Sequence, residues 1–204
     1  MHRILVIPAA LALLSGCLSL AKDYPERHLH AISAPRPEGA AAPAQGAILH
    51  VKPFTIAPRY AGTEFVYRRS DIEWESDFYH AFFVAPREAL TDESRAWMTA
   101  SGIFRAVVDG SSAIPPTHLV EGHIAALYAD IRTPGALKAV IELDVMLVDD
   151  RRVPPAALMS RRYTQAVAMR EDTPEALVAG WNSGLSAILT AFEVDLREAL
   201  AAPR

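Results

Sequence analysis

Cysteine is nearly absent from this 204-residue chain, which contains one such residue, Cys17. A single thiol excludes a disulfide within one chain, and an unpaired thiol in a secreted protein calls for an explanation. The chain also lacks the Walker A, Gly-x-Gly-x-x-Gly, Gly-x-Ser-x-Gly and His-Glu-x-x-His motifs. A nucleotide-binding P-loop is therefore excluded, whereas an active site assembled from distant positions is not.

Long apolar runs and an excess of one charge are also missing. The main apolar run, from Ile4 to Leu14, follows a short basic start that contains Arg3. It is shorter than the roughly 20 residues of a membrane-spanning helix and has the proportions of a signal peptide's hydrophobic region. The chain has 20 Lys and Arg against 24 Asp and Glu. Such a mildly acidic, mixed surface does not favour a nucleic-acid partner.

The apolar run ends in the letters "LSGC" (residues 14–17), which are similar to a bacterial lipobox. In that interpretation residues 1–16 are a lipoprotein signal peptide, and Cys17 receives lipid and becomes the first residue of the mature protein. Two or more acyl chains would give stable membrane anchoring. Leu18 and Ser19 follow without an aspartate, which favours the outer membrane by resemblance to enteric sorting rules. The alternative is a free, buried cysteine that happens to follow small residues.

Residues 17–46 are predicted to be the lipidated cysteine and a tether. The segment is rich in Pro, Ala and Gly, as in "SAPRPEGAAAPAQG", and buries too little apolar surface to order itself. Within it "RHLHAIS" (27–33) is expected to form a short strand at the edge of the domain. Residues 47–204 are then one domain, long enough to enclose a sizeable core.

The domain is predicted to be a two-layer α+β fold, a mostly antiparallel sheet with two main helices packed on it. "FYHAFFVAP" (78–86) is expected to begin a helix that continues, past an interruption at Pro86, to about Ala100. The second helix follows Thr173, with apolar residues at helical spacing. Strands are expected at "ILHVKPFTI", from Ser70 onward, at "FRAVV", and in three long segments: "THLVEGHIAALYADIR", "ALKAVIELDVMLVDD" and "ALMSRRYTQAVAMR".

Four carboxylates would share one face of an extended segment, with Ile72 and Trp74 on the other face: Asp71, Glu73, Glu75 and Asp77. They could form a calcium loop, but an EF-hand loop that starts at Asp71 needs glycine at Ser76 and glutamate at Phe82. The favoured interpretation is the solvated face of an amphipathic strand.

Other side chains that can carry chemistry are isolated. His28 and His30 would share a strand face, yet two histidines without a third ligand are weak evidence for a metal site, and no metal or cofactor is predicted. Four aromatic residues have helical spacing and are expected to be core, or otherwise to contact a partner or lipid: Phe78, Tyr79, Phe82 and Phe83.

From Ile48 onward the chain resembles the ABC-type transport auxiliary lipoproteins, the family that includes paraquat-inducible protein C. The resemblance lies in "VKPFTIAPRYAGTEFVYRRSDIEWESDFYHAFFVAP", "WMTASGIFRAVV", "LVEGHIAALYADIR" and "TPEALVAGWN". The chain departs from it at Trp74 and at His80-Ala81, which concerns local partner contacts.

The resemblance implies a periplasm-facing lipoprotein of an ABC or mammalian-cell-entry-type system that moves lipids or other hydrophobic compounds between membranes. The channel protein, permease and ATPase would be separate chains, and a homo-oligomer is possible. The resemblance supplies no catalytic residue. Lipidation is expected at Cys17, and partner contacts are expected at four acids and one aromatic residue of the segment from Ser70 onward: Asp71, Glu73, Trp74, Glu75 and Asp77.

Two other functions are considered. A lipid carrier would need a pocket lined by the aromatic residues around Phe78, and a hydrolase would need the carboxylates from Asp71 to Asp77 to converge in a cleft.

Overall fold

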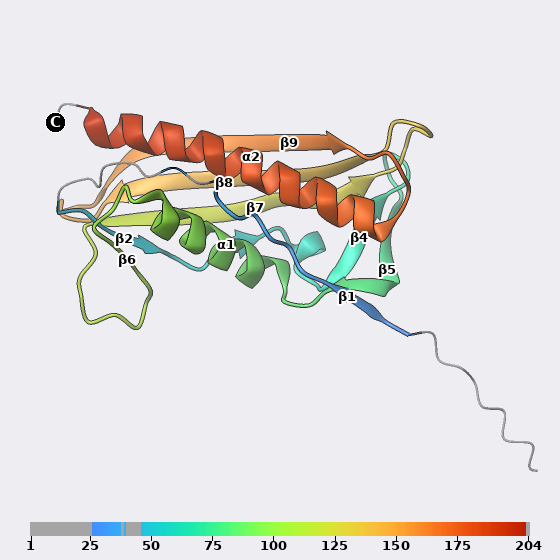
Figure 1. Cartoon of the computed structure of the whole chain (residues 1–204), viewed down its shortest axis with the longest axis horizontal. Helices are drawn as coiled ribbons and strands as arrows, with labels where there is room; N and C mark the ends of the chain where they lie inside the picture. Colours follow the sequence, from blue (N-terminus) through green and yellow to red (C-terminus); the bar gives the residue numbers. More distant parts are fainter. Residues whose placement is uncertain (1–25, 38, 40–45, 203–204) are drawn as a thin grey trace, which may run out of the picture.

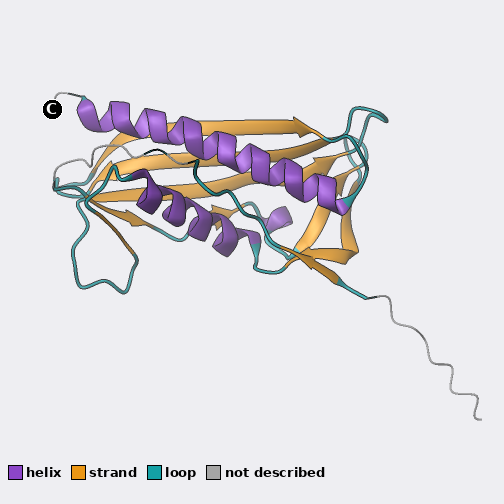
Figure 2. Cartoon of the chain, in the orientation of Figure 1, coloured by secondary structure: helices purple, strands orange, loops and turns teal. Residues whose placement is uncertain are grey.

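Figure 1 shows the computed structural model of the chain, which describes residues 26–37, 39 and 46–202. Helices α1 (Pro86–Ser101) and α2 (Pro174–Ala201) lie against a mixed sheet (Figure 2). The predicted α+β class, with two main helices on a sheet, is confirmed. The strands of the described part are β1 (His28–His30), β2 (Ile48–Val51), β3 (Thr55–Ile56), β4 (Glu64–Arg68), β5 (Trp74–Phe82), β6 (Ala106–Val108), β7 (His118–Asp130), β8 (Lys138–Asp149) and β9 (Ala156–Ala168).

Strands β7, β8 and β9 form the long antiparallel part of the sheet, as the sequence predicts. Their register runs from His118 opposite Asp149 to Asp130 opposite Lys138, and it continues from β8 to β9. Apolar and polar residues alternate along β8, because one face meets the helices and the other is wetter. The inward-facing residues of β8 are buried: Ile141, Leu143, Val145 and Leu147.

The short strands add the parallel pairings. Strands β2, β3 and β4 each run parallel to β7, and β6 runs parallel to β2. A short 3₁₀ turn, Pro58–Tyr60, separates β3 from β4. The segment predicted as one strand from Ile48 to Ile56 is two strands, because Pro53 lies between them and lacks a backbone donor.

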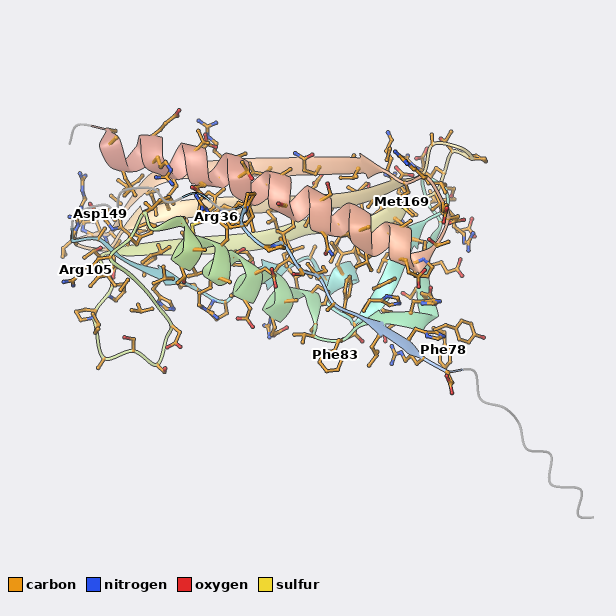
Figure 3. All side chains as sticks on the ribbon, viewed as in Figure 1. Arg36, Phe78, Phe83, Arg105, Asp149 and Met169 are labelled. Atoms are coloured by element: carbon orange, nitrogen blue, oxygen red, sulfur yellow. The ribbon has the colours of Figure 1, made fainter. Side chains whose placement is uncertain are left out.

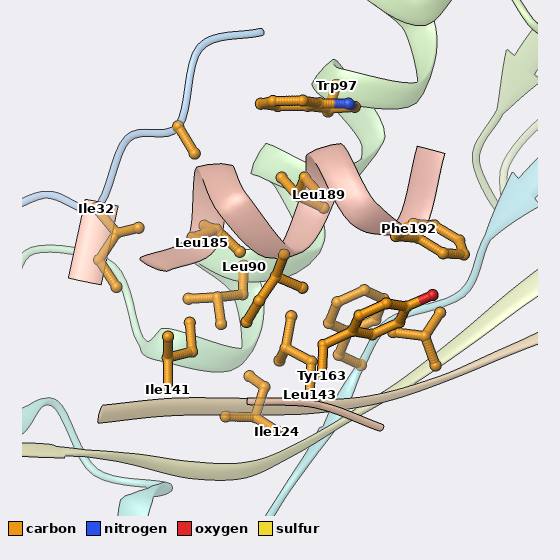
Figure 4. Close-up of a cluster of buried hydrophobic side chains, with 14 of the residues drawn as sticks. Ile32, Leu90, Trp97, Ile124, Ile141, Leu143, Tyr163, Leu185, Leu189 and Phe192 are labelled. Atoms are coloured by element: carbon orange, nitrogen blue, oxygen red, sulfur yellow. The ribbon is translucent and has the colours of Figure 1, made fainter. Parts of the chain in front are cut away.

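Helix α2 begins and packs as the sequence predicts. The hydroxyl of Thr173 accepts a hydrogen bond from the backbone N–H of Ala176 at 3.2 Å, and Pro174 occupies the first turn. Its apolar face is at most 2% exposed and closes the core (Figure 4): Leu177, Trp181, Leu185, Ile188, Phe192 and Leu196. A Cβ on Gly180 would lie 2.5 Å from the Cβ of Ala139, so glycine permits the close approach of α2 to β8.

The predicted helix start at Phe78 is wrong. Residues 78–82 continue strand β5, and α1 starts at Pro86. The end of α1 is as predicted, since Gly102 follows Ser101 with a left-handed φ of 63°.

The segment before β2 is part of the folded domain. The predicted short strand exists as β1, which runs parallel to β5. After it, Ile32 is 6% exposed and Ala34 is 3% exposed, and both belong to the hydrophobic core. The backbone N–H of Ser33 donates to the side-chain oxygen of Asn182 on α2 at 3.0 Å. Residues 26–37, here called the N-terminal arm, therefore belong to the folded domain although they lie ahead of the boundary set at residue 47.

Candidate functional site

The predicted partner-contact residues lie on the β4–β5 hairpin and its turn. Its loop is a tight turn in which the hydroxyl of Ser70 accepts hydrogen bonds from the backbone N–H groups of Ile72 and Glu73. Asp71 is exposed at the tip and forms ion pairs with Arg68 and with Arg132 from the β7–β8 loop, the latter at 2.6 Å. The turn is thus attached to the neighbouring loop by charge.

The four carboxylates do not share one strand face, contrary to the prediction. Asp71 and Glu73 lie in the turn because β5 begins only at Trp74, so only Glu75 and Asp77 are strand residues. Ile72 was expected on a buried face but is 93% exposed. The alternating sequence pattern does not produce a strand here, because the Ser70 hydroxyl accepts hydrogen bonds from two backbone N–H groups that a neighbouring strand would otherwise pair with.

Trp74, the first residue of β5, is half-buried. Its ring packs edge-on against Tyr60 and Tyr128. The guanidinium of Arg59 lies 4.5 Å from the ring centroid, and that of Arg68 lies 5.3 Å from it. The residue is a cation–π platform that supports the hairpin, with only part of its surface open to a partner.

The two strand carboxylates have local partners. Glu75 forms an ion pair with Arg69. Asp77 accepts a hydrogen bond from the hydroxyl of Tyr67 at 3.1 Å and from the backbone N–H of Tyr79 at 2.8 Å. Burial and the Asp77 carboxylate raise the pKa of Tyr67, so its phenol stays protonated and keeps donating.

Glu75 and Asp77 line one open hollow of about 440 Å³, and the turn acids do not line it. Its wall also includes Arg69, His80 and Asp172, and is mainly polar. The arrangement offers a mixed-charge surface to a macromolecule. It supplies neither an apolar cavity for an acyl chain nor convergence of all four carboxylates.

A histidine cluster was missed by the sequence interpretation. Pairing of β1 with β5 brings His80 next to both His28 and His30, with a ring nitrogen of His80 3.2 Å from one of His30. The rings of His28 and His80 are stacked, with centroids 5.2 Å apart. Burial, and then the neighbouring His80, lower the pKa of His30. Among the described residues, no group of three His, Cys, Asp or Glu side chains is arranged to hold a metal ion.

Of the aromatic residues expected in the core, some are buried and others are exposed. Phe82 is 4% exposed and packs on Phe65 and Trp181. Phe78 and Phe83 are instead 72% and 71% exposed; both lie along the edge where β1 runs, with Phe78 at the end of the molecule and Phe83 further in (Figure 3). The predicted lipidation residue, Cys17, lies outside the described residues. Within the described chain, no helix is both long and apolar enough to span a membrane.

The comparisons with known proteins identify the fold. No family model matches the chain, and no curated protein matches it. A crystal structure from Xanthomonas campestris, of a protein described as belonging to the DUF330 family, is 19% identical, with a TM-score of 0.70 over 81% of this chain and 92% of that chain. The protein CT253 from Chlamydia trachomatis is 8% identical, with a TM-score of 0.56 over 77% and 99% of the two chains. The chain is similar to these structures in its fold.

Proposed function

We propose that this protein is a lipoprotein, anchored by lipid on Cys17 to the periplasmic face of a bacterial outer membrane, that docks other proteins and does not transform a substrate. Its partners would be a mammalian-cell-entry-type channel protein and the ABC permease and ATPase of a system that moves lipids or other hydrophobic compounds. Contacts between copies of the chain are a further part of the proposal. The observation that carries it is the lipobox-like sequence ending at the chain's single cysteine.

The geometry of the hairpin supports docking. Asp71, Glu73 and Glu75 are exposed, and they are held by the serine-closed turn and by arginines, so the surface is preformed. Preformed polar groups lose little conformational freedom on binding. Anchoring adds to this, since a tethered domain has a high effective concentration near any channel that reaches its membrane.

The two other functions are less well supported. A lipid carrier needs an apolar cavity, whereas the hollow beside Phe78 is lined mainly by polar side chains and is open to solvent. A hydrolase needs unpaired, converging carboxylates, whereas Asp71 and Glu75 are each paired with arginine.

The anchor is tested by the Cys17→Ser variant. Serine lacks the thiol that accepts diacylglycerol, so we expect the precursor to remain unprocessed and to incorporate no radiolabelled palmitate. The measurement is palmitate labelling followed by gel analysis, with the wild-type chain as the positive control. Incorporation into Cys17→Ser equal to that into the wild type would refute lipidation at this residue.

The docking surface is tested by alanine substitutions in the hairpin. Single changes at Asp71, Glu73 or Glu75 should each weaken capture of the channel protein by about 1.4- to fivefold, because exposed charge pairs contribute roughly 0.2–1 kcal/mol each. Changes at Trp74 and Asp77 should also lower stability, since Trp74 packs on Tyr128 of β7 and Asp77 accepts a hydrogen bond from Tyr67 of β4. Crosslinking and copurification from native membranes measure capture.

The matched control is Glu198→Ala, which removes an exposed carboxylate from α2. Equal capture by this control and by a combined Asp71, Glu73 and Glu75 variant would contradict docking through the hairpin. Turnover of a lipid or glycan by the purified protein alone would overturn the non-enzymatic proposal.

A further inference from the structure

Exposed apolar side chains gather at one corner of the molecule. Nine large apolar residues of the described chain are exposed, and five of them lie where β1 runs beside β5 and just beyond it. They include all three exposed aromatic residues among the nine, and they are here called the corner patch: Leu29, Phe78, Tyr79, Phe83 and Val84. Isolated exposed apolar residues are ordinary, but a contiguous group of this kind marks an interaction surface.

Strand pairing brings Leu29 beside the β5 residues of the patch. Tyr79 and Ala81 are two positions apart on β5 and therefore share a face. Leu29 is paired with Ala81 and therefore lies on that same face. The backbone N–H of Phe83 donates to the carbonyl of His30 at 2.8 Å, which extends the pairing past the end of β5. The ring of Phe78 lies edge-on to that of Tyr79, with centroids 5.4 Å apart.

The corner patch lies where the chain enters the domain. From Cys17 to Glu26, the first described residue, there are nine Cα-to-Cα steps, which span at most about 30 Å. The segment from Cys17 to Glu26 is here called the leash. The 28 residues of α2 are about 42 Å long, so the leash is shorter than the domain. Leu29 follows Glu26 by three residues, so the patch stays close to whatever surface holds Cys17.

The N-terminal arm is held on the domain, so its residues do not add to the length of the segment between Cys17 and the domain. The guanidinium of Arg36 binds the carboxylate of Glu193 on α2, with 2.8 Å between Nε and Oε2. Together with the buried Ile32 and Ala34, this contact fixes the position from which the leash leaves the domain.

The composition of the patch fits a lipid surface. Aromatic side chains concentrate at membrane–water interfaces, where a ring is buried and a hydroxyl such as that of Tyr79 remains hydrated. The side chains of Arg27 and Arg87 are 46% and 54% exposed, lie close to the patch along the chain, and form exposed ion pairs with Glu64 and Glu88 that a phosphate could replace. Guanidinium groups are suited to bind the phosphates of lipid headgroups.

We propose that the corner patch inserts into the headgroup region of the bilayer that holds the lipid on Cys17, as a second attachment that orients the domain. The proposal rests on the lipidation proposed above. Lipid and protein contacts then act together, because the short leash keeps the patch at high local concentration next to the bilayer.

The first experiment uses the fact that lipidation consumes the chain's only thiol. Lipidated Phe83→Cys protein is labelled at position 83 with an environment-sensitive nitrobenzoxadiazole dye. It is then reconstituted into vesicles of phosphatidylethanolamine and phosphatidylglycerol. We expect blue-shifted emission and quenching by lipids that carry nitroxide near the headgroup. The matched control is Val153→Cys, because Val153 is 99% exposed in the β8–β9 loop, which follows Asp149 at the opposite end of the sheet (Figure 3).

A second experiment separates the patch from the anchor. Cys17→Ser protein that begins at residue 17, and so has neither the lipid nor the apolar signal segment, is floated with the same vesicles. A further Phe78→Ser and Phe83→Ser change should reduce vesicle binding about tenfold or more, whereas Val153→Ser should leave it unchanged. Absence of palmitate on wild-type Cys17 would refute the anchor. This flotation would still test whether the corner patch binds lipid.

Three results would overturn the proposal. One is a label at position 83 that remains in water in the lipidated, reconstituted protein. Another is equal vesicle binding by the double serine variant and the Val153→Ser control. The third is a blue shift that appears without vesicles and grows with protein concentration, because a second copy of the chain would then cover the patch.

Discussion

Replacing Trp181 with alanine is expected to lower the free energy of unfolding by about 4 kcal/mol. The side chain is fully buried, and its ring centroid lies 5.1 Å from that of Phe65 and 5.2 Å from that of Phe82. Its indole N–H donates to the carbonyl of Val140 at 3.1 Å. Alanine would leave a cavity between α2 and the sheet and would also remove the donor to that buried carbonyl. Urea unfolding followed by far-ultraviolet circular dichroism measures the change.

Two further variants separate these causes. Trp181→Phe keeps most of the ring but lacks the N–H, so it should lose only about 1–2 kcal/mol. Val194→Ala alters an apolar residue of the same helix that is 53% exposed, and should change stability by less than about 0.5 kcal/mol. A loss below about 1 kcal/mol for Trp181→Ala would show that this helix contributes little to the core.

Glu193→Gln is expected to lower the free energy of unfolding by about 2–3 kcal/mol at pH 7. The carboxylate is 8% exposed and accepts hydrogen bonds from Arg36, from Arg197 and from the indole N–H of Trp97, the last at 2.9 Å. Glutamine keeps the shape but removes the charge, which leaves the partly buried guanidinium of Arg36 without its counter-ion. Hydrogen exchange should show loss of protection in the N-terminal arm.

The pH dependence has a defined sign. The hydrogen bond from Arg36, followed by those from Arg197 and Trp97, lowers the pKa of Glu193 from 4.5 to about 2. The unfolded chain therefore takes up a proton at higher pH than the folded one. The stabilisation is complete above about pH 5 and is lost as the pH falls toward 2.

Glu193→Gln should accordingly flatten the stability profile in the acid range. The control is Glu198→Gln, on the same helix but exposed, which should keep the wild-type profile. Identical acid profiles for wild type and Glu193→Gln would show that the Arg36 contact does not contribute to stability.

Long periodic segments could be predicted from the sequence. Helix α2 and strands β7 to β9 were found because each repeats its pattern over many residues and ends at clear turn or cap residues. The aromatic block was misassigned for a specific reason. A spacing of four residues, as between Phe78 and Phe82 or between Tyr79 and Phe83, places side chains on one side of a helix and also on one face of a strand. Such spacing therefore cannot distinguish the two structures.

The candidate site depended on pairings that periodicity does not specify. His80 reaches His28 and His30 only because β1 lies beside β5, and Asp71 meets Arg132 only because two loops are neighbours. The hairpin acids belong to one short segment of the sequence, Asp71 to Asp77. Their division between a turn and a strand follows from Ser70, whose hydroxyl competes with the strand for backbone donors.

The contact between the N-terminal arm and α2 also sets an order of events in folding. Arg36 and Glu193 are 157 positions apart, and Ser33 and Asn182 are 149 apart. The arm, which precedes the other elements of the described domain, is thus held by α2, which follows them, whereas β7, β8 and β9 pair with neighbours in sequence. Since distant pairs close more slowly than local ones, we expect the antiparallel ribbon to form first. The arm should dock in a final, slower kinetic phase, after the whole chain has become available.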